Sequence, residues 1–467
     1  MAIEKDDDKF TKNAKEAVTG TKPDILDNGW HLKATSLSMP EINASVVVNS
    51  SSNFWRKLFA FSGPGFLIAV GYMDPGNWAT DLAGGAQFGY LLLSVIMISN
   101  FMAILLQHLS LKLGIVSGRD LAQACRDSYS KRFTIFLWIL CEIAIAACDL
   151  AEVIGSAVAL NLLFKIPLVI GVILTALDVL IVLYLQNKGF RYIEALVVGL
   201  ISVIGISFFY ELIISSPSLS GVFVGFIPTK QIIVNPSMLY IAIGILGATV
   251  MPHNLYLHSS IVQTRKYSRT TQGRGIAIKF ATIDSTFALM LALFINAAIL
   301  ILSAAVFHGS GHQDVADISD AYKLLSPLLG APLASVLFAI ALLASGQSAT
   351  LTGTMAGQIV MEGFLNIRLK PWVRRLLTRL VAIIPAVIVA SLYGAKGIGS
   401  LLILSQVVLS VQLSFAVVPL ILFTSDKTKM GQYVNSLWLK ITSWGVAVII
   451  MALNGFLLYQ VIIGLFK

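Results

Sequence analysis

Residues 71–78 read Gly-Tyr-Met-Asp-Pro-Gly-Asn-Trp, and residues 247–255 read Gly-Ala-Thr-Val-Met-Pro-His-Asn-Leu. Each stretch places a proline inside an apolar run, with an asparagine two residues later. The two prolines, Pro75 and Pro252, are 177 residues apart, and the two asparagines keep the same spacing. Proline removes a backbone donor and clashes with the preceding helical turn. The two stretches therefore predict two helices that are broken at corresponding positions.

The composition around these stretches is that of a membrane protein. Of the 467 residues, 57% are hydrophobic and only 12% are charged, whereas soluble domains carry about 25% charged residues. This excludes a soluble enzyme, a nucleic-acid binder and a disordered chain as first interpretations. Cys125, Cys141 and Cys148 form no CxxC pair and are expected to be free thiols. The sequence predicts an all-α polytopic membrane protein.

Eleven apolar runs are long enough to cross about 30 Å of hydrocarbon as helices. With the N-terminus inside, the loops on the cytosolic side carry 20 Lys and Arg residues, and the outer loops carry five. This asymmetry follows the positive-inside rule. We therefore expect a multi-pass plasma-membrane protein with a cytosolic N-terminus and an extracellular C-terminus. The runs are residues 58–82, 86–111, 133–163, 166–186, 192–215, 237–263, 280–307, 324–362, 372–393, 397–424 and 441–466.

The two broken helices are spans 1 and 6, so each repeat contains five spans, and this odd number inverts the second repeat in the membrane. We expect repeat one over residues 54–215 and repeat two over residues 216–424. A loop and an eleventh helix follow over residues 425–467. Residues 1–53 carry eight acidic and six basic residues, and they are expected to form a disordered cytosolic tail.

The residues at the two breaks point to a cation site. Asp74 and Asn77 bring an anionic and an amide oxygen to one unwound turn, and Met251 takes the place of Asp74 in the second break. Unwinding also frees carbonyls such as those of Tyr72 and Ala248. Paired breaks mark midplane transporter sites, and a thioether favours transition metals over Mg²⁺ or Ca²⁺. Mn²⁺ or Fe²⁺ is the inferred ligand; two ordinary proline kinks are the structural alternative.

Span 3 carries three carboxylates, Glu142, Asp149 and Glu152, at spacings that place them on one helix face. Charged groups inside a membrane are costly unless they face water or a partner. With His253, which follows Met251 closely, we interpret them as a proton route towards the cytosol. The structural alternative is ion pairing between helices. Its candidate partners are the charged residues Arg265, Arg374, Arg375 and Asp284.

The motifs Asp74-Pro-Gly-Asn77 and Met251-Pro-His-Asn-Leu-Tyr-Leu-His258 resemble those of the natural resistance-associated macrophage protein (Nramp) family of proton-coupled divalent metal transporters. The resemblance covers nearly the whole chain from about residue 55. It implies a leucine-transporter-type fold. It also implies a metal shell of Asp74, Asn77, Met251 and the Ala248 carbonyl, with a carbonyl of Tyr72 or Gly71 in some states. The methionine favours the Mn²⁺ and Fe²⁺ branch of the family.

The same resemblance assigns supporting residues. Gln107 in span 2 and Gln406 in span 10 match family glutamines near the site, and Gln406 is expected to join the metal shell in some conformations. Ser414 stands where the family often has proline, which favours a less kinked span 10. The positions implicated in proton transfer match Asp74, His253, Glu152, Asp149 and, more distally, Glu142. Supporting or gating roles are expected for Gln107, His258, Arg265, Arg374 and Arg375.

An organic-solute symporter on the same fold, such as an amino-acid symporter, is the main alternative. Such a protein leaves the break in helix 1 neutral to admit a substrate carboxylate, and Asp74 would repel that group. No HExxH, GxSxG or Walker pattern indicates an enzyme, and no filter-like loops indicate a channel. The sequence predicts a proton-coupled importer of Mn²⁺ or Fe²⁺ that works by alternating access. No resident cofactor, nucleic-acid partner or obligatory oligomer is expected.

Overall fold

The computed structural model describes residues 29–34, 36–48, 53–177, 189–313, 315, 317–369 and 371–465. Within these ranges, eight helices are long and apolar enough to cross a membrane. Their buried side chains form one main hydrophobic core with smaller clusters beside it. The expected all-α polytopic class is confirmed.

The first half of the chain starts with three consecutive short helices, α2, α3 and α4. A short helix, α2, leads through Ser62 and Gly63 into α3, and α4 follows after three non-helical residues. Pro64 and Pro75 begin α3 and α4, where a missing N–H costs nothing. Asp120 and Gln123 form a capping box at α6. The elements are α2 (Phe54–Phe61), α3 (Pro64–Gly71), α4 (Pro75–Phe88), η1 (Gly89–Leu92), α5 (Leu93–Ser117), α6 (Leu121–Ser128), α7 (Lys131–Phe164), α8 (Leu168–Leu174), η2 (Thr175–Leu177) and α10 (Phe190–Ser215).

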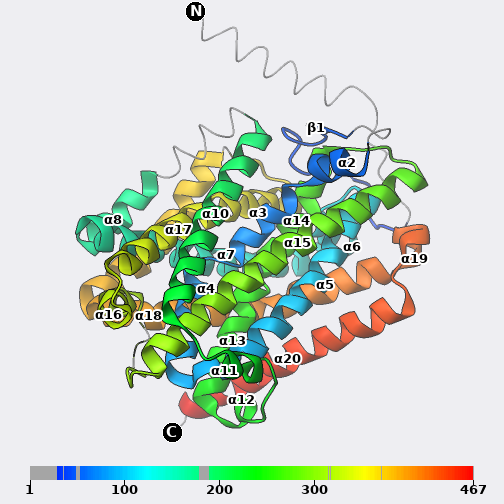
Figure 1. Cartoon of the computed structure of the whole chain (residues 1–467). Helices are drawn as coiled ribbons and strands as arrows, with labels where there is room; N and C mark the ends of the chain where they lie inside the picture. Colours follow the sequence, from blue (N-terminus) through cyan, green and yellow to red (C-terminus); the bar gives the residue numbers. More distant parts are fainter. Residues whose placement is uncertain are drawn as a thin grey trace, which may run out of the picture.

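The second half contains the other broken helix, α13 and α14, which Pro252 divides. With α3 and α4, these two helices run through the middle of the bundle (Figure 1). The elements are α11 (Leu219–Gly225), α12 (Gln231–Val234), α13 (Pro236–Thr249), α14 (Pro252–Ile261), η3 (Val262–Thr264), α15 (Thr271–Ser303), η4 (Ala304–His308), α16 (Ile318–Leu329), α17 (Pro332–Leu365), α18 (Pro371–Ser425), α19 (Lys427–Met430), η5 (Gly431–Tyr433) and α20 (Leu437–Leu465).

Three of the expected spans differ from the helices observed. The run 324–362 belongs to two helices, because Gly330 adopts a left-handed φ of 64° and ends α16 before α17 begins. The runs 372–393 and 397–424 lie in one helix, α18, since no proline between Pro385 and Pro419 forces a break there. Residues 178–186 of the run 166–186 lie outside the described residues. The backbone of α18 is helical at Ser414.

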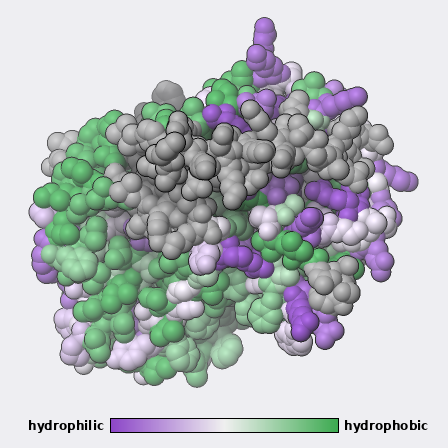
Figure 2. All heavy atoms as spheres, turned by 90° about the horizontal axis from the view of Figure 1, so that it is seen from above, coloured by the Kyte–Doolittle hydropathy of each residue, from purple (hydrophilic) through white to green (hydrophobic). Residues whose placement is uncertain are grey.

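One end of the bundle carries β1, α2, α6 and α19, and the opposite end carries α11, α12 and α16 (Figure 1). At the β1 end, β1 (Val46–Val47) pairs in parallel with β2 (Arg265–Lys266). Figure 2 views the molecule from above, where hydrophilic side chains gather on one side and hydrophobic ones cover much of the rest.

Part of the segment expected to be disordered is packed on the β1 end. Residues 1–28 of this segment lie outside the described residues. Residues 29–34 and 36–48, which we call the N-terminal strap, contact the helices instead. Trp30 and Ser38 are buried, and β1 is itself part of the strap. The expectation of disorder was therefore wrong for these residues, because they bury an aromatic ring and pair their backbone with β2.

Candidate functional site

The first helix break lies at Tyr72–Asp74, between α3 and α4. Asp74 has an extended backbone, and its Oδ1 accepts a hydrogen bond from the Asn77 N–H at 2.8 Å, which caps α4. The carboxylate is fully buried. Its other oxygen, Oδ2, has no hydrogen-bond partner among the described residues. The cap fixes the carboxylate at the break and leaves one oxygen for a ligand.

The second break lies at Val250 and Met251, between α13 and α14. Met251 has an extended backbone with φ −66° and ψ 120°. In a continuous helix the Ala248 carbonyl would accept from residue 252, but this residue is a proline without an N–H. The same argument applies to the Gly71 carbonyl and Pro75. The two prolines therefore break both helices where the sequence predicts, and each removes the donor from one carbonyl.

Gln406 of α18 lies beside both breaks. Its side-chain amide occupies the space that a Cβ at Gly76 would need, and its backbone carbonyl packs directly on Gly247 of α13. Gln406 Nε2 donates to Ser405 Oγ at 3.1 Å. The close approach at these two glycines brings α18 against the unwound turns of spans 1 and 6.

Several buried polar atoms at the breaks lack a hydrogen-bond partner among the described residues. Asp74 Oδ2, Asn77 Oδ1 and Gln406 Oε1 are buried without a hydrogen-bond partner within the part of the chain that the structure describes. Such atoms are rare in folded proteins and call for an explanation, such as a bound ion. In the described ranges, no three His, Cys, Asp or Glu side chains converge as a metal site. A cation here would therefore rest on one carboxylate, two amide oxygens and freed carbonyls.

Met251 places a thioether sulfur, a soft ligand, at the second break. It is fully buried and packs with Cys148 of α7 and Leu409 of α18. Cys148 lies within electrostatic reach of Asp74, so α7 links the two breaks. All three cysteines of the chain are free and buried, as expected.

Tyr72 is held from two sides. Its hydroxyl accepts from Gln107 Nε2 at 2.8 Å, and Gln107 Oε1 hydrogen-bonds to His258 Nδ1 at 2.9 Å. This chain joins the first break to α5 and α14, which places Gln107 and His258 beside the site. The Tyr72 carbonyl accepts from Asn296 Nδ2 of α15 at 2.8 Å. In this conformation Asn296 therefore occupies the carbonyl that was expected to bind metal in some states.

Two of the span 3 carboxylates lie together against α17. Asp149 and Glu152 are buried, and a Cβ at Gly353 would lie 2.8 Å from Glu152 Oε1 and 3.5 Å from Asp149 Oδ1. Glu152 Oε2 accepts from Thr350 Oγ1 at 3.1 Å. Asp149 interacts electrostatically with His253 at the second break. These polar groups lie between the second break and the α7–α17 interface.

Glu142 lies further along α7, two helical turns from Asp149. It is half-buried, and its Oε1 accepts from Trp138 Nε1 at 2.9 Å. The side chains of Arg374 and Arg375, which were considered as partners or gating groups, lie outside the described residues.

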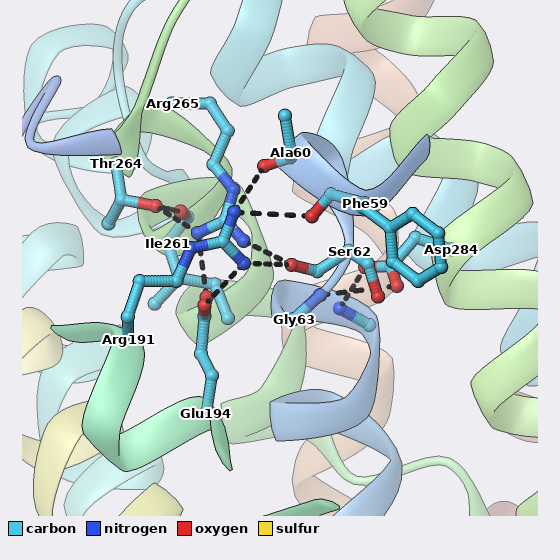
Figure 3. A network of polar contacts seen from close by, with 11 residues as sticks. Phe59, Ala60, Ser62, Gly63, Arg191, Glu194, Ile261, Thr264, Arg265 and Asp284 are labelled. Carbon is cyan, nitrogen blue, oxygen red and sulfur yellow. Dashed lines mark hydrogen bonds and ion pairs between the residues drawn. The ribbon is translucent and has the colours of Figure 1, made fainter. Parts of the chain in front are cut away.

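Arg265 and Asp284 do not pair with the span 3 carboxylates. Arg265 Nη1 donates to Glu194 Oε1 of α10 at 2.6 Å, and both side chains are buried. Asp284 of α15 accepts from the N–H groups of Gly63 at 3.3 Å and Gly65 at 2.7 Å (Figure 3). They are therefore not the ion-pair partners of span 3 that the structural alternative considered, because both sit at the β1 end, where the start of α3 offers unsatisfied backbone groups.

These residues hold the connection between α2 and α3. The Ser62 carbonyl accepts from Arg265 Nη2 at 2.5 Å and from Arg191 Nη1 at 2.8 Å (Figure 3). Arg191 Nη2 also donates to the carbonyls of Phe59 and Ala60. We call the set Arg191, Glu194, Arg265 and Asp284 the α2–α3 clamp. It ties span 1 to α10, β2 and α15.

Four further polar residues near the site were not singled out from the sequence. Asn296 and Ser345 donate to backbone carbonyls of the first break, and Thr350 donates to Glu152. They come from distant helices, so no spacing signals them. Asp81 is different, because it is a buried acid seven residues after Asp74 on the same helix face. That spacing was visible in the sequence.

Two proline-broken helices packed around a buried polar site, inside a bundle of apolar helices, define a polytopic membrane protein of the leucine-transporter type. The comparisons with known proteins agree. The chain belongs to the natural resistance-associated macrophage protein-like (Nramp) family, whose model matches residues 65–460.

Individual relatives are similar over most of their length. A "Divalent metal cation transporter MntH" from Nostoc sp. is 64% identical over 427 residues, which cover 91% of this chain and 97% of that protein. The crystal structure of the Eremococcus coleocola manganese transporter with an aromatic bis-isothiourea substituted compound matches with a TM-score of 0.84 and 45% identity over 90% of each chain. MHP1, a nucleobase-cation-symport-1 family transporter, matches over 84% of this chain and 88% of its own, with a TM-score of 0.57 and 16% identity, and so shows the fold alone. These relatives are transporters, not enzymes.

Proposed function

We propose that this protein is a proton-coupled secondary transporter that imports Mn²⁺ or Fe²⁺ by alternating access. The observation that carries the proposal is a set of oxygens of Asp74, Asn77 and Gln406 at the two helix breaks, which have no hydrogen-bond partner among the described residues. The relatives described as divalent metal cation and manganese transporters support it. The mixture of carboxylate, amides, freed carbonyls and the Met251 thioether suits a divalent transition metal better than Ca²⁺ or Mg²⁺.

An uptake panel tests this function directly. The purified chain is reconstituted in liposomes, and uptake of Mn²⁺, Fe²⁺, Ca²⁺ and Mg²⁺ is measured while the internal pH is recorded. Mn²⁺ and Fe²⁺ are expected to enter and to acidify the interior, whereas Ca²⁺ and Mg²⁺ are not. Metal-independent uptake of an amino acid, with no uptake of Mn²⁺, would instead support an organic-solute symporter.

In the proposed mechanism, metal binding at Asp74 displaces a proton that leaves along α7. His253 and Asp149 receive it first, because Asp149 interacts electrostatically with His253. Glu152 lies next, where its Oε2 accepts a hydrogen bond from the Thr350 hydroxyl. The metal and the proton therefore share only Asp74 in this mechanism, and beyond it the proton follows its own route along α7.

Glu152→Gln is expected to uncouple protons from metal. The amide keeps the shape and the hydrogen bond from Thr350 but cannot carry a proton, so Mn²⁺-dependent acidification should fall to background while Mn²⁺ still enters. Parallel recordings of Mn²⁺ uptake and internal pH check this. Glu211→Gln is the matched control, since Glu211 is a buried membrane carboxyl on α10 outside the proposed route, and it should keep both signals. Unchanged Mn²⁺-dependent acidification in the Glu152 variant would remove Glu152 from the route.

Alternating access requires the β1 end to open, and we propose that this end faces the cytosol because the basic clamp residues lie there. The α2–α3 clamp holds span 1 against α10 and α15, which supports assignment of this conformation to a state closed at the β1 end. Release of metal to the cytosol would require the clamp to part, so that α3 can move away from α14.

Glu194→Gln is expected to open the β1 end. The substitution leaves the Arg265 guanidinium buried without its counter-charge, which costs several kcal/mol in the closed state. Ile68→Cys on α3, a buried position, should then react with a membrane-impermeant thiol reagent at least about tenfold faster. The reagent is applied from the β1 side, and the native cysteines are buried. Lys323→Gln, which breaks an exposed pair at the opposite end, should not change the rate. Equal rates for both variants would show that the clamp does not control opening.

A further inference from the structure

The N-terminal strap is anchored at its start by one aromatic side chain. The Trp30 ring is 8% exposed. Two cations lie over it: the Arg119 guanidinium is 4.7 Å from the ring centroid, and the Lys429 ammonium is 5.2 Å from it. The Phe423 ring packs beside it at 5.6 Å. Cation–π contacts of this kind are strongest where water is excluded. This anchor joins the strap to α18, α19 and the loop before α6.

The middle of the strap is held by buried hydrogen bonds. The Leu32 N–H donates to the Asp127 carbonyl of α6 at 3.2 Å. Ser38 Oγ donates to Asp120 Oδ2 at 2.6 Å and lies 2.6 Å from Ser260 Oγ of α14. Because Ser38 has one hydroxyl proton, Ser260 is the donor in the second bond. Ser38 therefore ties the start of α6 to the last turn of the second broken helix.

The end of the strap reaches the α2–α3 clamp. The Ala44 N–H donates to the Gln263 carbonyl at 2.9 Å, and Val46 pairs with Arg265 in the parallel ladder. The side chain of the same Arg265 binds the Ser62 carbonyl. Strap pairing therefore fixes the backbone of a residue whose side chain holds span 1 closed. The strap and the α2–α3 clamp are therefore connected through Arg265.

The strap is also weakly held compared with the helices that it crosses. Within the described residues 29–34 and 36–48, only Trp30 and Met39 bury an apolar side chain. Ile42 and Val48 are only partly buried against the core, and the other contacts described above are hydrogen bonds, of which those of Ser38 are buried. Segments with few buried apolar contacts open at low free-energy cost. The strap can therefore leave its site while the helical bundle stays folded.

We propose that the N-terminal strap is an autoinhibitory latch that holds the β1 end closed when docked. Docked, it connects α6, α18–α19 and α14–β2, so α14 cannot separate from its neighbours. Undocked, it frees the backbone of Arg265 and weakens the clamp. The inference rests on the proposed alternating-access function and adds a regulatory element to it.

A reversible cross-link tests the latch in the full-length chain. Since the hydroxyl oxygens of Ser38 and Ser260 are 2.6 Å apart, Ser38→Cys with Ser260→Cys is expected to form a disulfide under diamide. Oxidation should pin the strap and lower Mn²⁺ uptake in proteoliposomes at least about tenfold, and reduction should restore it. The two single variants, treated identically, should not change. Equal uptake in the oxidised and reduced states, an uptake loss that reduction does not reverse, or failure of the disulfide to form would each overturn the proposal.

A second variant tests the opposite direction without any metal. Trp30→Ala should release the strap, so the β1-side thiol reagent should label Ile68→Cys at least about tenfold faster than in the parent. Leu32→Ala is the matched control, because Leu32 is in the same segment but 54% exposed. An unchanged labelling rate in the Trp30 variant would overturn the latch. Absence of Mn²⁺ uptake by the parent would instead contradict the proposed function, and the labelling result would still decide the latch.

Discussion

Replacing Asp74 with alanine is expected to abolish Mn²⁺ uptake into proteoliposomes. Among the described residues, Asp74 is the only carboxylate within the two non-helical turns, and its Oδ1 also caps α4. Alanine removes the anionic ligand. The remaining neutral donors then cannot compensate for the free energy of dehydrating a divalent ion. The uptake rate should fall to that of empty liposomes, measured as initial rates over a range of Mn²⁺ concentrations.

Asp74→Asn separates the two roles of this side chain. Asparagine is also a good helix cap, so this variant should keep α4 intact and still lose uptake because the charge is gone. Asp320→Asn, an exposed carboxylate at the α16 end, should transport normally. Robust uptake by either Asp74 variant would show that the metal does not bind at the helix breaks.

Replacing Met251 with alanine is expected to change which ions the protein accepts. Loss of the thioether leaves a shell of oxygen donors, which suits Ca²⁺ as well as Mn²⁺. The Ca²⁺ concentration that halves Mn²⁺ uptake should fall roughly 100-fold, which corresponds to about 2.8 kcal/mol. Mn²⁺ affinity should weaken by less than about tenfold. Competition curves in the same liposomes measure both quantities.

Met251→Leu distinguishes the sulfur from its volume. Leucine keeps the packing against Cys148 and Leu409 nearly unchanged, so it should behave like alanine if the sulfur sets selectivity. If side-chain volume sets selectivity instead, this variant should show the same Ca²⁺ competition as the parent. Met355→Leu on α17, another buried methionine, is the control for a methionine away from the breaks. Ca²⁺ competition that is unchanged in both Met251 variants would exclude the thioether as the selectivity element.

The broken helices were predictable because their cause is local. Pro75 and Pro252 cannot donate to a preceding carbonyl in any fold, and the residues beside them belong to the same turn. The capping role of Asp74 is similarly local. The family motif at these two turns was therefore sufficient to place Asp74, Asn77, Ala248 and Met251 at the breaks.

Predictions that depended on pairing between distant segments were less successful. Arg265 was considered as an ion-pair partner for span 3 under the structural alternative, but it pairs with Glu194, which lies 71 residues away along the chain. The strap was expected to be disordered because its composition is polar, yet one tryptophan in contact with two cations anchors it. Composition averages over a segment and does not register a single buried side chain.

The sequence by itself determined the membrane class, the two breaks and the polar residue types that lie at them. Covalent geometry and hydrophobic transfer act on each segment wherever it lies, so both can be inferred without coordinates. Only the tertiary structure decided that Gln406 covers Gly76, that Asn296 occupies the Tyr72 carbonyl, and that the strap pairs with the backbone of Arg265. These contacts join residues far apart in the chain, and their geometry is set by how whole helices pack against each other.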